Sequence, residues 1–247
     1  MIGCNFKFIN SNDSNREEWI LKTLKDIPEG QSLLDAGAGE QRYRKYCSHL
    51  EYVSQDFCQY KGKAIVGTGK DEVWNTDKIE IVSDIIDIPR EDESFDNIMC
   101  TEVFEHIKRP ELAIKEFYRL LKKNGRLVLT APFASFTHMA PYHYYTGFNR
   151  FWYEEILTDN GFEIIEVTQN GNWFSYVGQE ATRANYMSKE FSLKPMNLLA
   201  KGITFLFAKL MDKYAKLNKN SEEVACFGYN IIARKKQILS EININSH

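Results

Sequence analysis

Apolar side chains recur along the chain at two spacings, one typical of helices and one typical of strands. In residues 110–123 they fall three and four positions apart, which predicts a helix that stops at Asn124 and Gly125. A helix of this kind presents one apolar stripe to a protein core. Similar patterns predict further helices at residues 14–26, 151–160 and 198–217.

Short apolar runs between these helices predict seven strands. Each run is four to seven residues long and is bounded by polar residues, glycine or proline. The runs lie at residues 32–35, 52–56, 79–83, 97–101, 126–130, 162–167 and 227–233. Strands that alternate with helices favour an α/β fold with a parallel sheet covered on both faces. We therefore expect residues 1–247 to form a single domain.

Residues 168–223 are too long for an ordinary connection between the last two strands. We expect a mainly helical insertion that forms a lid or wall, in which Trp173 and Phe174 either stack on a bound molecule or anchor the insertion. The helix at residues 198–217 places its lysines on one arc and its apolar residues on the other. The favoured interpretation packs the apolar arc on the domain or on a second subunit, as in a homodimer. Contact with a membrane surface or another partner stays open.

The charge balance and the cysteines narrow the class of protein. With 31 Lys or Arg against 34 Asp or Glu, the formal net charge is -3. The sequence lacks the stripe of basic residues that would indicate a nucleic-acid partner. The five cysteines show neither metal-knuckle nor redox spacing, which favours reduced thiols. The sequence has no apolar run long enough to span a membrane and no signal-peptide core near Met1. We therefore expect a cytoplasmic protein.

A Gly-x-Gly turn after the first strand is the clearest candidate site. Asp35 ends that strand, and Gly37 and Gly39 follow it, before an expected helix. Glycines let the backbone turn sharply and approach a ligand closely. Asp56 ends the next strand, 21 residues after Asp35, where a carboxylate can accept hydrogen bonds from a ribose diol.

A nicotinamide dinucleotide is the nearest rival ligand. Its Gly-x-Gly-x-x-Gly fingerprint requires glycine where Arg42 stands. Asp35 beside the turn is also unfavourable for two phosphates and favourable for a cation. The sequence therefore favours a positively charged nucleoside over a dinucleotide.

These residues, with three later segments, resemble the class I S-adenosylmethionine-dependent methyltransferases of the type 11 kind. The segments are residues 83–89, residues 94–106 with a Glu-x-x-Glu-His signature, and residues 121–130. The resemblance covers residues 32 to about 167. It implies a Rossmann-like sandwich of seven strands, mostly parallel with an antiparallel last strand. It also implies S-adenosylmethionine as the cofactor and S-adenosylhomocysteine as the product.

The resemblance further implies which residues bind the cofactor. Asp35, Gly37 and Gly39 would line its methionine end, and Asp56 its ribose. Asp84 and Ile85 would contact the adenine, and Glu102 would lie near the point where the methyl donor meets the acceptor. Gln41 departs from the family, which commonly has a third glycine there. It either starts the expected helix or narrows the site.

Three histidines are the candidate catalytic residues. If the acceptor is a hydroxyl, a general base would assist the displacement, and His106, His138 and His143 are available. His143 in its tyrosine-rich loop is the preferred substrate contact, whereas for His106 a structural role in holding its loop is favoured over catalysis. Zinc binding by His138 and His143 is disfavoured, because no third ligand has metal-like spacing; we therefore expect no metal.

The expected acceptor is a small molecule, a sugar or a lipid-linked intermediate, methylated at oxygen. Two other functions stay open. One is a non-catalytic protein that binds the cofactor as a scaffold or partner, and the other is a nicotinamide-dependent oxidoreductase.

Overall fold

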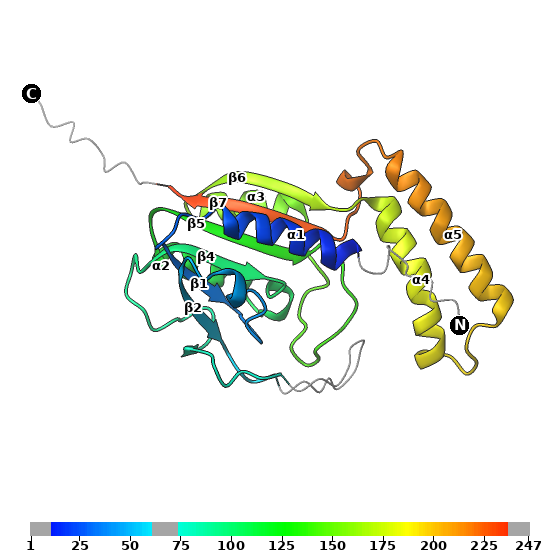
Figure 1. The fold of residues 1–247 in the computed structure, drawn as a ribbon, viewed down its shortest axis with the longest axis horizontal. Coiled ribbons are helices and arrows are strands. Elements are labelled where there is room, and N and C mark those ends of the chain that lie inside the picture. Colours follow the sequence, from blue (N-terminus) through cyan, green and yellow to red (C-terminus); the bar gives the residue numbers. More distant parts are fainter. Residues whose placement is uncertain (1–10, 61–73, 237–247) are drawn as a thin grey trace, which may run out of the picture.

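The protein, described by a computed structural model over residues 11–60 and 74–236, is built around a seven-stranded sheet of order β3-β2-β1-β4-β5-β7-β6 (Figure 1). Strand β7 runs antiparallel to both of its neighbours, and the other six run parallel to one another. This confirms the expected fold class. The strands are β1 Ser32–Ala36, β2 Glu51–Asp56, β3 Ile81–Val82, β4 Phe95–Thr101, β5 Leu121–Pro132, β6 Phe162–Asn170 and β7 Gly228–Lys235.

Helices cover both faces of the sheet, which is why its central strands are apolar along most of their length. On one face α1 (Ser11–Lys25) packs Ile20 and Leu24 against β1, β4 and β5. On the other face α2 (Pro110–Leu120) and α3 (Arg150–Asp159) pack Phe117 and Tyr153 into the larger core cluster. The helices leave the carboxyl ends of the parallel strands as the edge at which ligands bind in such sheets.

Three local expectations were wrong. No α-helix follows the glycine turn, because Gln41 adopts a left-handed backbone with φ of 58°, and only the short 3-10 helix η1 (Arg44–Tyr46) forms. The helix predicted to reach residue 123 ends at Leu120, since the backbone is already extended at Leu121. Strand β3 is also shorter than the predicted strand at residues 79–83.

Two helices, α4 (Trp173–Phe191) and α5 (Leu198–Lys216), lie between β6 and β7 and pack on each other beside the sheet (Figure 1). The sequence did not predict α4. Ala208 and Met211 are the buried residues of α5. Its apolar arc faces outward instead, and Leu206 is 67% exposed. Apart from Met211, the expectation that this arc is buried on the domain was therefore wrong, and its packing on a second subunit stays a prediction. Among the described residues, none of the helices is long and apolar enough to cross a membrane.

Candidate functional site

The turn after β1 requires glycine at two positions. Gly37 and Gly39 have φ values of 76° and 51°, which side chains rarely allow. A Cβ at Gly37 would also lie 2.6 Å from Val103, and one at Gly39 would lie 2.9 Å from Trp74. The turn therefore packs closely against Val103, which follows β4, and against Trp74, which precedes β3.

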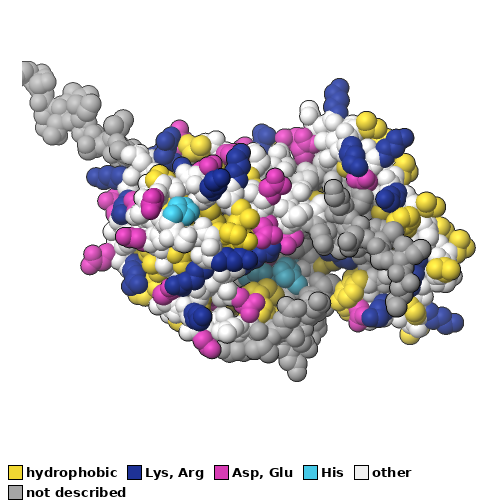
Figure 2. Space-filling model, in the orientation of Figure 1, with side chains coloured by type: hydrophobic (Ala, Val, Ile, Leu, Met, Phe, Trp, Pro, Cys, Tyr) yellow, Lys and Arg dark blue, Asp and Glu magenta, His cyan; other side chains and the backbone are white. Residues whose placement is uncertain are grey.

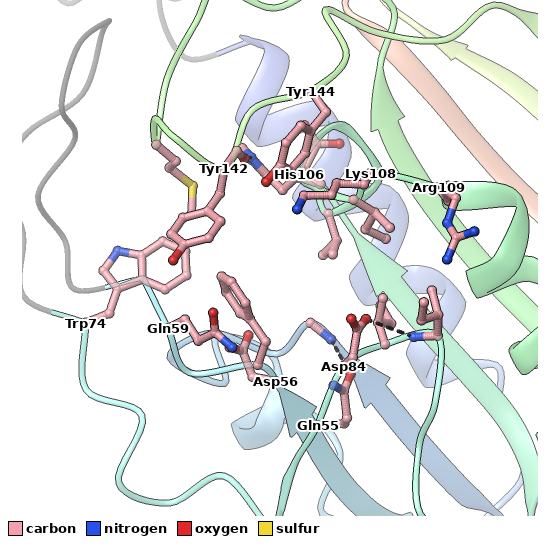
Figure 3. Close-up of a pocket in the computed structure, with 18 residues that line it drawn as sticks. Gln55, Asp56, Gln59, Trp74, Asp84, His106, Lys108, Arg109, Tyr142 and Tyr144 are labelled. Carbon is pink, nitrogen blue, oxygen red and sulfur yellow. Dashed lines mark hydrogen bonds between the residues drawn. The ribbon is translucent and has the colours of Figure 1, made fainter.

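A cavity of about 360 Å³ opens at this edge of the sheet (Figure 3). Acidic and apolar residues from the ends of β1, β2 and β4 form one side, and Trp74, Tyr142 and Tyr144 face them across the opening. Five of the seven residues predicted to bind the cofactor line this cavity: Gly37, Asp56, Asp84, Ile85 and Glu102. Asp35 and Gly39 do not line it.

Asp56 links the glycine turn to the segment after β2. Its Oδ2 accepts a hydrogen bond from the Gly39 amide at 3.0 Å, and its Oδ1 accepts one from the Cys58 amide at 2.8 Å. The side chain is nearly buried and still borders the cavity. Asp56 therefore holds the turn in place and faces any molecule bound there.

Asp35 lies behind the turn, on the face of the sheet that α1 covers. Its carboxylate is 3% exposed and accepts a hydrogen bond from the Tyr52 hydroxyl at 2.5 Å. Burial raises the pKa of Asp35 to about 7, against the hydrogen bond from Tyr52, and the nearby Asp56 raises it further. Asp35 can therefore affect the glycine turn, although its side chain does not line the cavity.

Glu102 follows β4 in a left-handed backbone conformation with φ of 54°. One carboxylate oxygen pairs with Arg16 of α1 at 2.9 Å, and the other accepts a hydrogen bond from the Thr130 hydroxyl at 3.0 Å. Arg16 was not predicted to belong to the site. No spacing rule connects it to Glu102, which lies 86 positions away.

The three candidate histidines form one cluster. His106 lies in the 3-10 helix η2 (Phe104–His106), and the other two lie in the loop after β5. The ring centres of His106 and His138 are 4.7 Å apart, and those of His138 and His143 are 4.8 Å apart. Only His106 lines the cavity.

Burial lowers the pKa of His106 to about 4, and burial followed by the charge of His138 lowers the pKa of His143. The Nδ1 of His106 lies against the carbonyl oxygen of Tyr142, which can only accept, so this nitrogen carries the proton. His106 therefore presents an unprotonated Nε2 near neutral pH. Such a nitrogen can accept a proton or bind a metal.

The sequence missed two cations at the cavity. Lys108 and Arg109 line it, and Lys108 points into it in Figure 3. Neither forms an ion pair with another described residue. In contrast, Gln41 points away and accepts a hydrogen bond from Arg44 at 2.7 Å, so it does not narrow the cavity.

The expected lid aromatics also lie outside the cavity. The Trp173 and Phe174 rings contact each other edge to face, and Phe174 stacks on Tyr214 of α5 with ring centres 5.7 Å apart. Of the two interpretations of these residues, anchoring of the insertion is the one that fits these contacts.

Known proteins share both the sequence pattern and the fold. Residues 34–129 match the family described as methyltransferase domain. A demethylmenaquinone methyltransferase from Clavibacter sepedonicus is 27% identical over 120 residues, which is 47% of this chain and 47% of that protein. The match thus spans about half the length of this relative.

Solved structures share the fold at low identity. The cyclase SpnF superposes with a TM-score of 0.54 at 15% identity, covering 90% of this chain and 81% of that one. The phosphoethanolamine N-methyltransferase 2 from Haemonchus contortus, solved with S-adenosyl-L-methionine, gives 0.52 at 20% identity and covers 90% of this chain and 52% of that one. At these identities the similarity shows the fold alone.

Proposed function

The chain belongs to the class I S-adenosylmethionine-dependent methyltransferase family, and from this premise we propose that it transfers a methyl group from S-adenosylmethionine to a small-molecule or glycan-like acceptor, at oxygen. The observation that carries the proposal is the cavity, at which the glycine turn, Asp56, Asp84 and Glu102 meet. Asp56 would accept hydrogen bonds from the ribose, and Asp84 with Ile85 would contact the adenine. Glu102 would lie beside the methyl group.

The reaction is an in-line displacement. The acceptor oxygen forms a bond to the methyl carbon, the carbon–sulfur bond breaks, and its electron pair stays on the sulfur of S-adenosylhomocysteine. Such a step depends mainly on positioning and on the exclusion of water. The hydroxyl proton would pass to His106 or His143, because burial lowers the pKa of both rings and leaves them neutral and able to accept it.

The acceptor would enter between the aromatic residues and the cations. Trp74, Tyr142 and Tyr144 offer stacking faces, which suits a sugar or a phenol. Lys108 and Arg109 would attract an anionic substituent on it. We favour oxygen as the methylated atom because a hydroxyl acceptor would need a general base, and the histidines can supply one.

The exposed face of α5 supports a lipid-linked acceptor. Leu199, Leu206 and Leu210 are exposed on α5 together with its four lysines, and Asp212 is its one acidic residue. Figure 2 shows hydrophobic and basic side chains side by side at this end of the molecule. A second copy on this face would bring lysines together, whereas an anionic lipid surface complements them. We therefore propose that α5 binds anionic membranes.

A non-catalytic scaffold is the second candidate, because the similarity to solved structures shows the fold alone and a fold does not fix a reaction. The test has two parts. S-adenosylhomocysteine binding is measured by calorimetry, and turnover is measured as S-adenosylhomocysteine released with phenols, sugars and lipid-linked sugars. Release with one acceptor class supports the proposal. Binding without release from any acceptor favours the scaffold, and no binding overturns both.

A further inference from the structure

A buried carboxylate and two histidine rings converge beside the cavity. One ligand atom from each of Glu105, His106 and His138 lies within 4.8 Å of the other two. The distance between His106 Nε2 and Glu105 Oε1 is 3.7 Å. The residues come from η2 and from the loop after β5, so their spacing along the chain is not that of a metal-binding motif.

The two histidines are held in the form that binds metals. His106 donates from Nδ1 to the Tyr142 carbonyl, and His138 donates from Nδ1 to the Phe136 carbonyl at 2.8 Å. Carbonyl oxygens only accept, so both protons sit on Nδ1 and both Nε2 lone pairs are available. A backbone carbonyl behind the ring is the usual support of a metal-binding histidine.

Glu105 gives the second, independent indication. Its side chain is 2% exposed, and its Oε2 has no hydrogen-bond partner among the described residues. A buried oxygen without a partner is costly and calls for an explanation. A cation placed between this oxygen and the two rings would satisfy it.

We propose that Glu105, His106 and His138 bind one divalent transition-metal ion. Two imidazoles and one carboxylate suit Zn²⁺ and the ions close to it, and they leave at least one position open. Zinc–ligand bonds of about 2.1 Å place neighbouring ligand atoms roughly 3.4 Å apart, so the side chains must close by about 1 Å. His138 lies in a partly exposed loop and can make that movement.

The site adjoins the cavity through His106, as Figure 3 shows for that residue and Tyr142. The following consequence rests on the proposed function. A hydroxyl bound at the open position would lose its proton more readily. His143 would then be the cluster member left to accept that proton. Its ring centre lies 4.8 Å from that of His138, and its Nε2 shares a hydrogen bond with the Ser135 hydroxyl.

The test is direct binding of Zn²⁺ to the metal-stripped full chain, without cofactor or acceptor. Competition with a chromophoric chelator gives stoichiometry and affinity, and Co²⁺ gives a visible absorption spectrum that reports its ligands. We expect one ion per chain. His138→Asn and Glu105→Gln should each weaken binding beyond the roughly 10- to 100-fold typical of a residue that only orients a ligand.

His49→Asn is the matched control, because His49 lies outside the cluster and contacts the Leu24 carbonyl. It should leave Zn²⁺ binding unchanged. Should Glu105→Gln fail to fold, the partly exposed His138 decides the question alone. Wild-type affinity equal to that of His138→Asn, or loss in the His49 variant as well, overturns the proposal. S-adenosylhomocysteine binding is measured on the same samples, so failure of the metal site is distinguishable from failure of the cofactor site.

Discussion

Asp56 offers the sharpest test of the cofactor site, because its two roles can be separated. In Asp56→Ala the amides of Gly39 and Cys58 lose their acceptor and the proposed ribose contacts disappear. In Asp56→Asn one oxygen remains, so part of the support of the glycine turn persists. The two substitutions should therefore differ in stability and agree in binding.

The magnitude follows from the hydrogen bonds. A hydrogen bond to a charged group contributes about 1.5–3 kcal/mol, so loss of two ribose contacts should cost about 3–6 kcal/mol of binding free energy. That corresponds to a dissociation constant raised on the order of 10²- to 10⁴-fold. Stability should fall by roughly 1–3 kcal/mol in Asp56→Ala, because a buried amide is left without a partner.

The assay is calorimetric titration with S-adenosylhomocysteine, paired with urea unfolding. Glu80→Gln is the matched control, since Glu80 accepts hydrogen bonds from the Ser54 amide and hydroxyl on β2 and does not line the cavity. It should bind as the wild type does. Unchanged affinity in Asp56→Asn, or an equal loss in Glu80→Gln, would refute the ribose assignment.

Three further predictions follow from buried charge, backbone conformation and surface. The folded pKa of Asp35, about 7, lies above the ordinary value of 3.8, so the stability that Asp35 contributes is full below pH 3.8 and is lost as pH rises to about 7. Asp35→Asn should remove this loss, as urea unfolding at pH 5 and pH 8 would show; equal pH dependence in both proteins contradicts it. Gly37→Ala should destabilise the fold by about 1–3 kcal/mol, because it combines a positive φ with contact to Val103; thermal unfolding within error of wild type contradicts this. Sedimentation with anionic vesicles should be lost in Leu206→Asp/Leu210→Asp and retained in Val224→Asp, an exposed apolar control outside α5; equal sedimentation of all three proteins would contradict the α5 surface.

The sheet was predictable because its signals are local. Each of the seven apolar runs became a strand, since a run buried on both faces carries its own pattern. α4 was not predictable in this way, because its sequence mixes polar and aromatic residues and its main packing partner is α5. For α5 the pattern gave the helix and its apolar arc. The pattern did not predict which arc of α5 is buried. Burial depends on which residues of α5 face α4.

The site was predictable wherever a motif ties a residue to a strand end. Asp56 ends β2, and Asp84 and Glu102 come after β3 and β4, so the parallel sheet brings all three to one edge. Contacts between distant segments left no such signal. Arg16 reaches Glu102 only because α1 packs across the sheet, and Glu105 meets His138 only through the loop after β5.

The structure changes the argument from charge that first favoured a cationic cofactor. That argument placed an ionised Asp35 beside the ligand, but Asp35 lies outside the cavity and burial raises its pKa to about 7. The charge of Glu102 is balanced by Arg16 at 2.9 Å, and Lys108 adds a positive charge to the cavity. Attraction of the sulfonium is therefore weaker than the number of acids suggests. In the proposed mode of binding, recognition of the cofactor would therefore rest mainly on hydrogen bonds to Asp56 and on the close backbone approach that Gly37 allows.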